Sequence, residues 1–203
     1  MRLNLREGTK SLARGVAHVL IAPCVGSFAV RSWLVGRDRA LLATSQWLAL
    51  VPGLPGQYLR RAFLQRAIAH CHHTVVVEWG TTVSRVGTRL DENAYIGPSC
   101  HLGLVHVERD ALIAAGVHIP SGGVTHNFDD PSVPIRDQER SERLVRVGAG
   151  AWIGSAAKVM ADVGAGTVVG AGSVVTRPLP PGMVAAGVPA RVLRSRVAAP
   201  RAV

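Results

Sequence analysis

A six-residue recurrence of single aliphatic side chains restricts what this chain can fold into. In a first stretch, the aliphatic residue returns at or near every sixth position, at Ile96, Leu102, Val107, Ile113 and Ile119. After a polar interruption it returns at Val147, Ile153, Val159, Val163, Val169 and Val175. Such a unit makes a short strand and a bend, three units close a triangular turn, and stacked turns pair their backbones about 4.8 Å apart. The period therefore predicts a mainly β fold, a parallel β-solenoid over residues 74–177 with an inserted loop over 126–145.

Small residues and glycines fit the corners of such a coil. Ala111, Ala157 and Ser173 stand two places before an aliphatic residue, and Gly148 and Gly154 directly follow one. The glycines are spaced GxGxxxG, so the six-residue period explains them better than a dinucleotide-binding GxGxxG motif does. Two shorter steps, five residues to Val107 and four to Val163, predict that the coil is locally shortened.

Residues 1–73 lack this period, and their apolar residues cluster at helical spacing. We expect one helix to open at Asp38 as a capping residue and to end at the PGLPG segment. The next helix has an apolar stripe that includes Tyr58 and Phe63. Its basic positions, Arg60, Arg61, Gln65 and Arg66, are expected to face either solvent or an anionic membrane surface, and both readings stay open.

Composition favours one domain with trimmings, because 203 residues with 48% hydrophobic side chains can bury one sizeable core. Residues 16–35 are long enough to span a bilayer, but His18, Pro23 and Arg31 disfavour insertion. No apolar stretch of a secretory signal directly follows MRLNLREGTK, so we expect no cleavage. Three widely spaced cysteines suggest no disulfide framework. We therefore expect a cytoplasmic protein, with peripheral contact at the inner membrane face as an open alternative.

The formal net charge of +10 is compatible with nucleic acid, an anionic membrane or a phosphorylated ligand. No interleaved aromatic platform and no reading-helix motif accompanies the charge, so we expect no nucleic-acid partner.

The segment from Trp152 to Arg194 closely resembles the C-terminal half of the hexapeptide-repeat acyltransferases, which acetylate sugars, serine and some antibiotics. The resemblance extends weakly back to Val75 and does not cover the helical first third. It implies a left-handed parallel β-helix, although general rules on crossovers alone favour the right-handed sense. It also implies a homotrimer, with coenzyme A in the groove between adjacent subunits, and a C-terminal extension over residues 178–203.

The same resemblance implies that His126 is the general base, because it opens a loop shortly after the family's I-A-x-x-V-x-I coil segment, here residues 113–119. An imidazole suits this role, since its ordinary pKa of about 6.5 lets it accept a proton near neutral pH. The implied reaction is transfer of an acetyl group from acetyl-CoA to a hydroxyl of a sugar or glycan intermediate by direct attack. No Ser or Cys nucleophile and no metal is required, in agreement with the absence of a GxSxG motif.

Positions that match the family's cofactor segments are Trp152, Ser155, Ala171, Thr176, Arg177, Arg191 and Arg194. They imply a pantetheine groove, with the last two arginines near the phosphates. For the acceptor, Ser99 or His101 lies nearest to the polar residue that family members often carry. Loop residues able to hydrogen-bond a polyhydroxylated acceptor are Asp129, Asp130, Arg136 and Gln138, although an ordinary solvated loop would look the same.

Two other classes stay open. His101 and His106 are spaced HxxxxH with His118 nearby, as in zinc-dependent β-helical carbonic anhydrases, and residues 70–73 form a second His and Cys cluster. The other alternative is a non-enzymatic β-helical scaffold.

Overall fold

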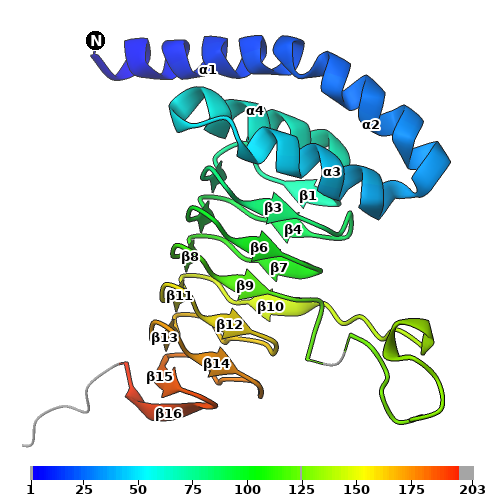
Figure 1. Cartoon of the computed structure of the whole chain (residues 1–203). Helices are drawn as coiled ribbons and strands as arrows, with labels where there is room; N and C mark the ends of the chain where they lie inside the picture. Colours follow the sequence, from blue (N-terminus) through cyan, green and yellow to red (C-terminus); the bar gives the residue numbers. More distant parts are fainter. Residues whose placement is uncertain (1, 124, 197–203) are drawn as a thin grey trace, which may run out of the picture.

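Helices lie across one end of a column of stacked strands (Figure 1). A computed structural model describes residues 2–123 and 125–196. Within this part the helices are α1 (Arg2–Leu20), α2 (Ala22–Val35), α3 (Arg37–Ala49) and α4 (Gly53–Ala67). The helices α3 and α4 contact the first strands of the column, and α1 and α2 pack on them from outside.

The strands form three parallel sheets, one on each face of the column. Sheet A contains β1 (His70–Cys71), β4 (Arg89–Leu90), β7 (Val105–Val107) and β10 (Val145–Val147). Sheet B contains β2 (Val76–Val77), β5 (Tyr95–Ile96), β8 (Leu112–Ile113), β11 (Trp152–Ile153), β13 (Val168–Val169), β15 (Met183–Gly187) and the antiparallel β16 (Ala190–Ser195). Sheet C contains β3 (Thr82–Val83), β6 (His101–Leu102), β9 (His118–Ile119), β12 (Lys158–Val159) and β14 (Val174–Val175).

This arrangement is the left-handed parallel β-helix that the six-residue period and the family resemblance together predict. Val76 pairs with Tyr95, a separation of 19 residues, and Trp152 pairs with Val168, a separation of 16. The shorter coil contains the four-residue step to Val163, so the predicted local shortening is confirmed. The strand β15 continues sheet B beyond residue 177, and β1 joins sheet A before residue 74. Two-residue strands are too short to show their boundaries in the sequence.

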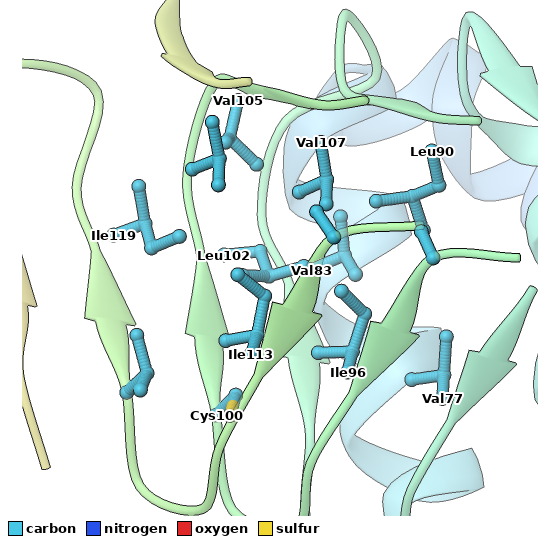
Figure 2. Close-up of a cluster of buried hydrophobic side chains, with 14 of the residues drawn as sticks. Val77, Val83, Leu90, Ile96, Cys100, Leu102, Val105, Val107, Ile113 and Ile119 are labelled. Carbon is cyan, nitrogen blue, oxygen red and sulfur yellow. The ribbon is translucent and has the colours of Figure 1, made fainter. Parts of the chain in front are cut away.

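The recurring aliphatic side chains point into the column and form its core, as Figure 2 shows for Val83, Ile96, Leu102 and Ile113. These side chains are at most 1% exposed, and Cys100 fills a small space among them. Burial raises the pKa of the Cys100 thiol, which keeps it protonated. The core is therefore a continuous aliphatic stack with few aromatic rings.

Some glycines after the inward residue are required by close approach between coils. A Cβ atom on Gly154 would lie 2.5 Å from the backbone nitrogen of Ala171 in the next coil. One on Gly164 would lie 2.3 Å from the nitrogen of Pro181. A side chain at these positions would push adjacent coils apart and break their pairing.

The helical region closes the open edge of the first coil. Arg60 donates from Nε to the carbonyl of Val77 at 2.9 Å, and Arg61 donates from Nη1 to that of Val75 at 3.1 Å. Arg60 is 3% exposed and Arg61 8%, so the prediction that they face solvent or a membrane is wrong. An unpaired strand edge presents carbonyls that need donors, and burying the two guanidinium groups supplies them. Arg66, in contrast, is exposed.

The expected cap at Asp38 is also wrong. Helix α3 starts one residue earlier, and its N-cap, Gly36, makes no side-chain hydrogen bond. Asp38 instead accepts a hydrogen bond from the backbone nitrogen of Val86 at 2.8 Å. The carboxylate therefore joins the helical region to the coil.

No single described helix is both long and apolar enough to cross a membrane. Residues 11–20 and 22–35 reach the required length and hydropathy only as a pair, and they meet at a bend of 47°.

Candidate active site

The polar interruption of the repeat is a loop that leaves the coil after β9 and returns at β10 (Figure 1). At its base, the backbone nitrogen of Arg143 donates to the carbonyl of Ser121 at 2.8 Å. Farther out, the nitrogen of Asn127 donates to the carbonyl of Glu139 at 2.8 Å. The two arms of the loop therefore run together, and these two hydrogen bonds fix the start of the loop.

His126 lies between these two hydrogen-bonded steps. Its side chain is partly buried, and Nδ1 is buried with no hydrogen-bond partner among the described residues. A buried ring nitrogen normally has a partner that sets the tautomer and the ring orientation. In one isolated chain, therefore, nothing described fixes which ring nitrogen carries the proton.

Ion pairs fasten the returning arm of the loop to the rest of the molecule. Arg143 pairs with Asp162 at 2.8 Å, from Nη2 to Oδ1, across adjacent coils. Glu142 pairs with Arg85, whose Nε lies 2.7 Å from Oε2 of the carboxylate. Arg85 also lies 3.8 Å from Asp38 of α3. These contacts hold the loop that carries His126 against both the coil and the helical region.

The predicted acceptor residues on the loop are exposed or nearly so, and two of them are engaged within the loop. Gln138 donates to the carbonyl oxygens of Asp130 and Val133, at 2.7 and 2.8 Å. Hydrogen bonds from Ser132 hold the pKa of the Asp130 carboxyl below its ordinary value. Arg136 makes only a long contact to Asp137, 3.5 Å, and Asp129 accepts no side-chain hydrogen bond among the described residues. Arg136 and Asp129 are therefore the freer pair.

Ser99 and His101 lie apart from the loop. Ser99 occupies the corner between sheets B and C with φ +57°, and its side chain is exposed. His101 stands on the outer face of sheet C, where Nδ1 lies 2.8 Å from the hydroxyl of Thr82. Both precede the sheet C strands or lie on them, whereas the His126 loop leaves from their far ends.

The outer face of sheet C carries a row of polar side chains that only the coil register reveals. In successive coils Thr82, His101, His118 and Lys158 are aligned, and the two imidazole rings meet edge to face with centroids 4.9 Å apart. Burial lowers the pKa of both histidines; His118 and then Arg85 lower that of His101 further, and Lys158 lowers that of His118. No sequence pattern singles out Thr82 or Lys158, because their partners stand one coil away, at separations of 19 and 40 residues.

The residues predicted to bind coenzyme A fall into three groups. Trp152, 51% exposed, stands on sheet B, and Arg191 and Arg194 are exposed on β16 of the same sheet. Ser155 and Ala171 are exposed at the corner between sheets B and C. Thr176 and Arg177 are exposed beyond the far end of sheet C, at the corner from which the His126 loop leaves. One chain does not bring all three groups to one place.

The geometry separates the histidines of the zinc alternative. His101 lies on sheet C and His106 on sheet A, where Nε2 of His106 lies 2.8 Å from Asp91. In the second cluster, His70 faces Asp91 at 3.8 Å, while Cys71 is buried and its pKa is raised to about 12 by burial. Among the described residues, no group of three His, Cys, Asp or Glu side chains could hold a metal ion. Neither cluster converges on one ion.

No family model matches the chain, but curated proteins are similar to it. The galactoside O-acetyltransferase of Escherichia coli K12 is 28% identical over 163 residues, covering 70% of this chain and 80% of that protein. The putative lipopolysaccharide biosynthesis O-acetyl transferase WbbJ of the same organism is 30% identical over 131 residues, covering 55% of this chain and 67% of that protein.

A solved structure is similar in fold and sequence. It is a galactoside acetyltransferase in complex with coenzyme A, which superposes with a TM-score of 0.62 at 25% identity and covers 78% of each chain. The region shared with these proteins is large enough to contain both the column of coils and the inserted loop.

Proposed function

The chain belongs to the hexapeptide-repeat O-acetyltransferase family, and on that premise we propose that it transfers the acetyl group of acetyl-CoA to a hydroxyl of a sugar or glycan intermediate, with His126 as general base. That the chain is an acetyl-CoA-dependent acyltransferase follows from its relatives. The acceptor, the base and the assembly described below are the proposal.

The position of His126 is the observation that carries the proposal. The loop leaves the coil at Pro120 and Ser121, beside Met160 and Thr176 of the next two coils, since His118, Lys158 and Val174 are in register. A histidine held at the base of a fastened loop, rather than at its exposed tip, can keep one position relative to a ligand bound along the column. Catalytic groups are commonly carried in this way, on loops that a rigid scaffold positions.

The residues present fit coenzyme A. Its pantetheine arm needs a partly apolar surface, and Trp152 offers an exposed ring with Leu112, 43% exposed, beside it in the sheet. Its phosphates need cations, and Arg177, Arg191 and Arg194 are exposed arginines. We propose that these residues and the neighbouring Ser155, Ala171 and Thr176 hold the donor.

The bound donor supplies the acetyl group as an activated thioester. The imidazole of His126 would accept the proton of the acceptor hydroxyl and later return it to the departing sulfur, so the ring ends each cycle unchanged. This task requires one ring nitrogen to face the acceptor and the other to be oriented. Nδ1 is the buried nitrogen, so Nε2 would face the acceptor.

We further propose that the active site is completed by a second copy in a homotrimer. The three groups of predicted coenzyme A residues lie on different sides of one column, and the buried Nδ1 of His126 has no partner among the described residues. Symmetric packing of columns side by side would bring sheet B of one chain against the loop corner of another. An acceptor for the Nδ1 proton would then come from the neighbouring chain or the bound ligand.

For the acceptor we propose the space between the loop and the sheet C face. Arg136 and Asp129 are the loop side chains with the most free hydrogen-bonding capacity, and Ser99 and His101 line the same sheet nearer the other corner. Asp130 and Gln138 would support the loop rather than bind directly, because both are engaged within it.

We propose that the enzyme works in the cytoplasm and touches an anionic membrane surface through α1 and α2. Leu12, Val19, Trp33 and Leu34 on these helices are 63–86% exposed, a mixture of tryptophan and aliphatic side chains that suits an interface. Binding to anionic liposomes should then weaken as salt increases. Absence of binding at low salt would exclude this contact.

The decisive experiment follows thiol release from acetyl-CoA with a panel of sugars and lipid-linked glycans. In His126→Ala, kcat should fall by about 10²- to 10⁴-fold with little change in the KM for acetyl-CoA, because proton transfer contributes about that much. His70→Ala is the matched control, since His70 is also a partly exposed histidine but lies on sheet A at the other end of the coil. Undiminished turnover in His126→Ala would exclude the mechanism.

A further inference from the structure

A small polar pocket lies between α1, α4 and the turn after β1, away from the proposed active site. Arg14 and His18 line it from α1, Arg61 and Gln65 from α4, and His73 from the turn. Its volume is about 50 Å³. A water molecule needs roughly 10–15 Å³ of such space, so the pocket has room for one small ion rather than for a nucleotide.

Two polar atoms in its wall are buried without a partner among the described residues. They are Nε of Arg14 and Nδ1 of His18. The two residues are four positions apart on α1, so both side chains lie on the same face of the helix. Buried donors are normally hydrogen-bonded, and two orphaned nitrogens directed to one small space indicate a missing acceptor.

The charge around the pocket is positive on all sides. Arg14 and Arg61 carry fixed charges, and burial lowers the pKa of Arg61, with Arg14 adding to the effect. Burial also lowers the pKa of His73, and the neighbouring His72, Arg14 and Arg61 lower it further, opposed only by Glu92. The described residues that line the pocket include no carboxylate. A cation-rich pocket without a counter-ion favours an anion.

We propose that this pocket binds a phosphate group, as inorganic phosphate or as a phosphomonoester. A phosphoryl group offers several acceptor oxygens, and guanidinium groups bind it with charge-assisted hydrogen bonds. Arg14, His18, Gln65 and His73 are the residues able to donate, while Arg61 is already shared with the carbonyl of Val75 and stacks on Tyr58, 4.6 Å from the ring centroid. The phosphate would join α1 to α4 and to the first coil.

The phosphate could reach the pocket from solution or as a lipid headgroup. Helix α1 is the outermost element at this end of the molecule (Figure 1), and Leu12, Val19 and Leu20 on it are 63–74% exposed. Both sources present the same chemistry to Arg14 and His18, and experiments can separate them.

Thermal stability and calorimetry test the site on the full-length protein. Inorganic phosphate should raise the Tm of the wild type above that in sodium chloride of equal ionic strength, because a ligand that binds only the folded state stabilises it. Arg14→Gln and His18→Gln should each weaken phosphate binding by about tenfold, the effect of losing one charge-assisted hydrogen bond. Arg37→Gln, which removes an exposed arginine outside the pocket, is the matched control and should bind as the wild type does.

Vesicles identify the source. If the ligand is a lipid, phosphatidylcholine vesicles containing phosphatidic acid, a phosphomonoester, should retain the wild type better than vesicles with equally charged phosphatidylserine, and free phosphate should compete. If only free phosphate binds, the ligand is soluble. The proposal is overturned if neither phosphate nor phosphatidic acid acts beyond ionic strength, or if both pocket variants bind phosphate as the wild type does. The acetyl transfer assay is independent of either result.

Discussion

Replacing Arg60 by methionine should open the capped edge of the coil. The substitution keeps an unbranched apolar stem in the buried space and removes the guanidinium. Nε donates to Val77 at 2.9 Å, and Nη1 donates to Leu48 and Val51 at 3.0 and 2.7 Å. Three carbonyls, one on the first coil and two at the end of α3, would lose their donor together.

The magnitude follows from these contacts. A hydrogen bond to a charged group contributes at least about 1.5 kcal/mol, so the three together contribute roughly 4–5 kcal/mol. Burial lowers the pKa of Arg60, which shows that the folded state penalises its charge, and Nη2 is buried without a partner among the described residues. Relief of this penalty offsets part of the loss, and we expect a net destabilisation of about 2–4 kcal/mol.

The assay is thermal unfolding at one protein concentration, because assembly makes the Tm depend on concentration. For a domain of this size each kcal/mol shifts the Tm by about 2–4 °C, so Arg60→Met should lower it by roughly 5–12 °C. Arg66→Met is the control, since Arg66 lies on the same helix and is exposed. Equal small shifts in the two variants would show that Arg60 does not cap the edge.

Three further predictions follow from the coil. Gly154→Ala should destabilise by about 1–3 kcal/mol through collision with Ala171, more than Gly150→Ala, which meets only the strain of φ +63°; equal Tm values would contradict the close approach. Trp152→Ala should raise the KM for acetyl-CoA by about tenfold with little change in Tm, because the ring is half exposed; an unchanged KM would remove it from the donor site. The pKa of His101 is lowered by burial, so the unfolded chain takes up its proton first and stability falls as pH drops below about 6.5. In His101→Gln the loss of Tm between pH 7 and 5 should be smaller, and an unchanged slope would refute it.

The site illustrates how far sequence patterns extend. The loop and the placement of His126 at its start could be predicted, because the interruption of a regular period is visible in one chain. The roles of His126 and of the coenzyme A residues stay predictions. Their separation into three groups could not be foreseen, because the motifs that match the family are continuous in sequence while consecutive positions turn onto different faces of the column.

The sequence by itself determined the coil. One aliphatic residue in six, with small residues at the corners, is a local pattern, and each unit meets the same requirement of an inward side chain and a bend. Only the tertiary structure decided what happens between coils and at their ends. The aligned row of His101, His118 and Lys158 depends on coil lengths and on a loop that separates partners by 40 residues. The burial of Arg60 and Arg61 depends on an open strand edge whose carbonyls need donors, and helical periodicity contains no information about that edge.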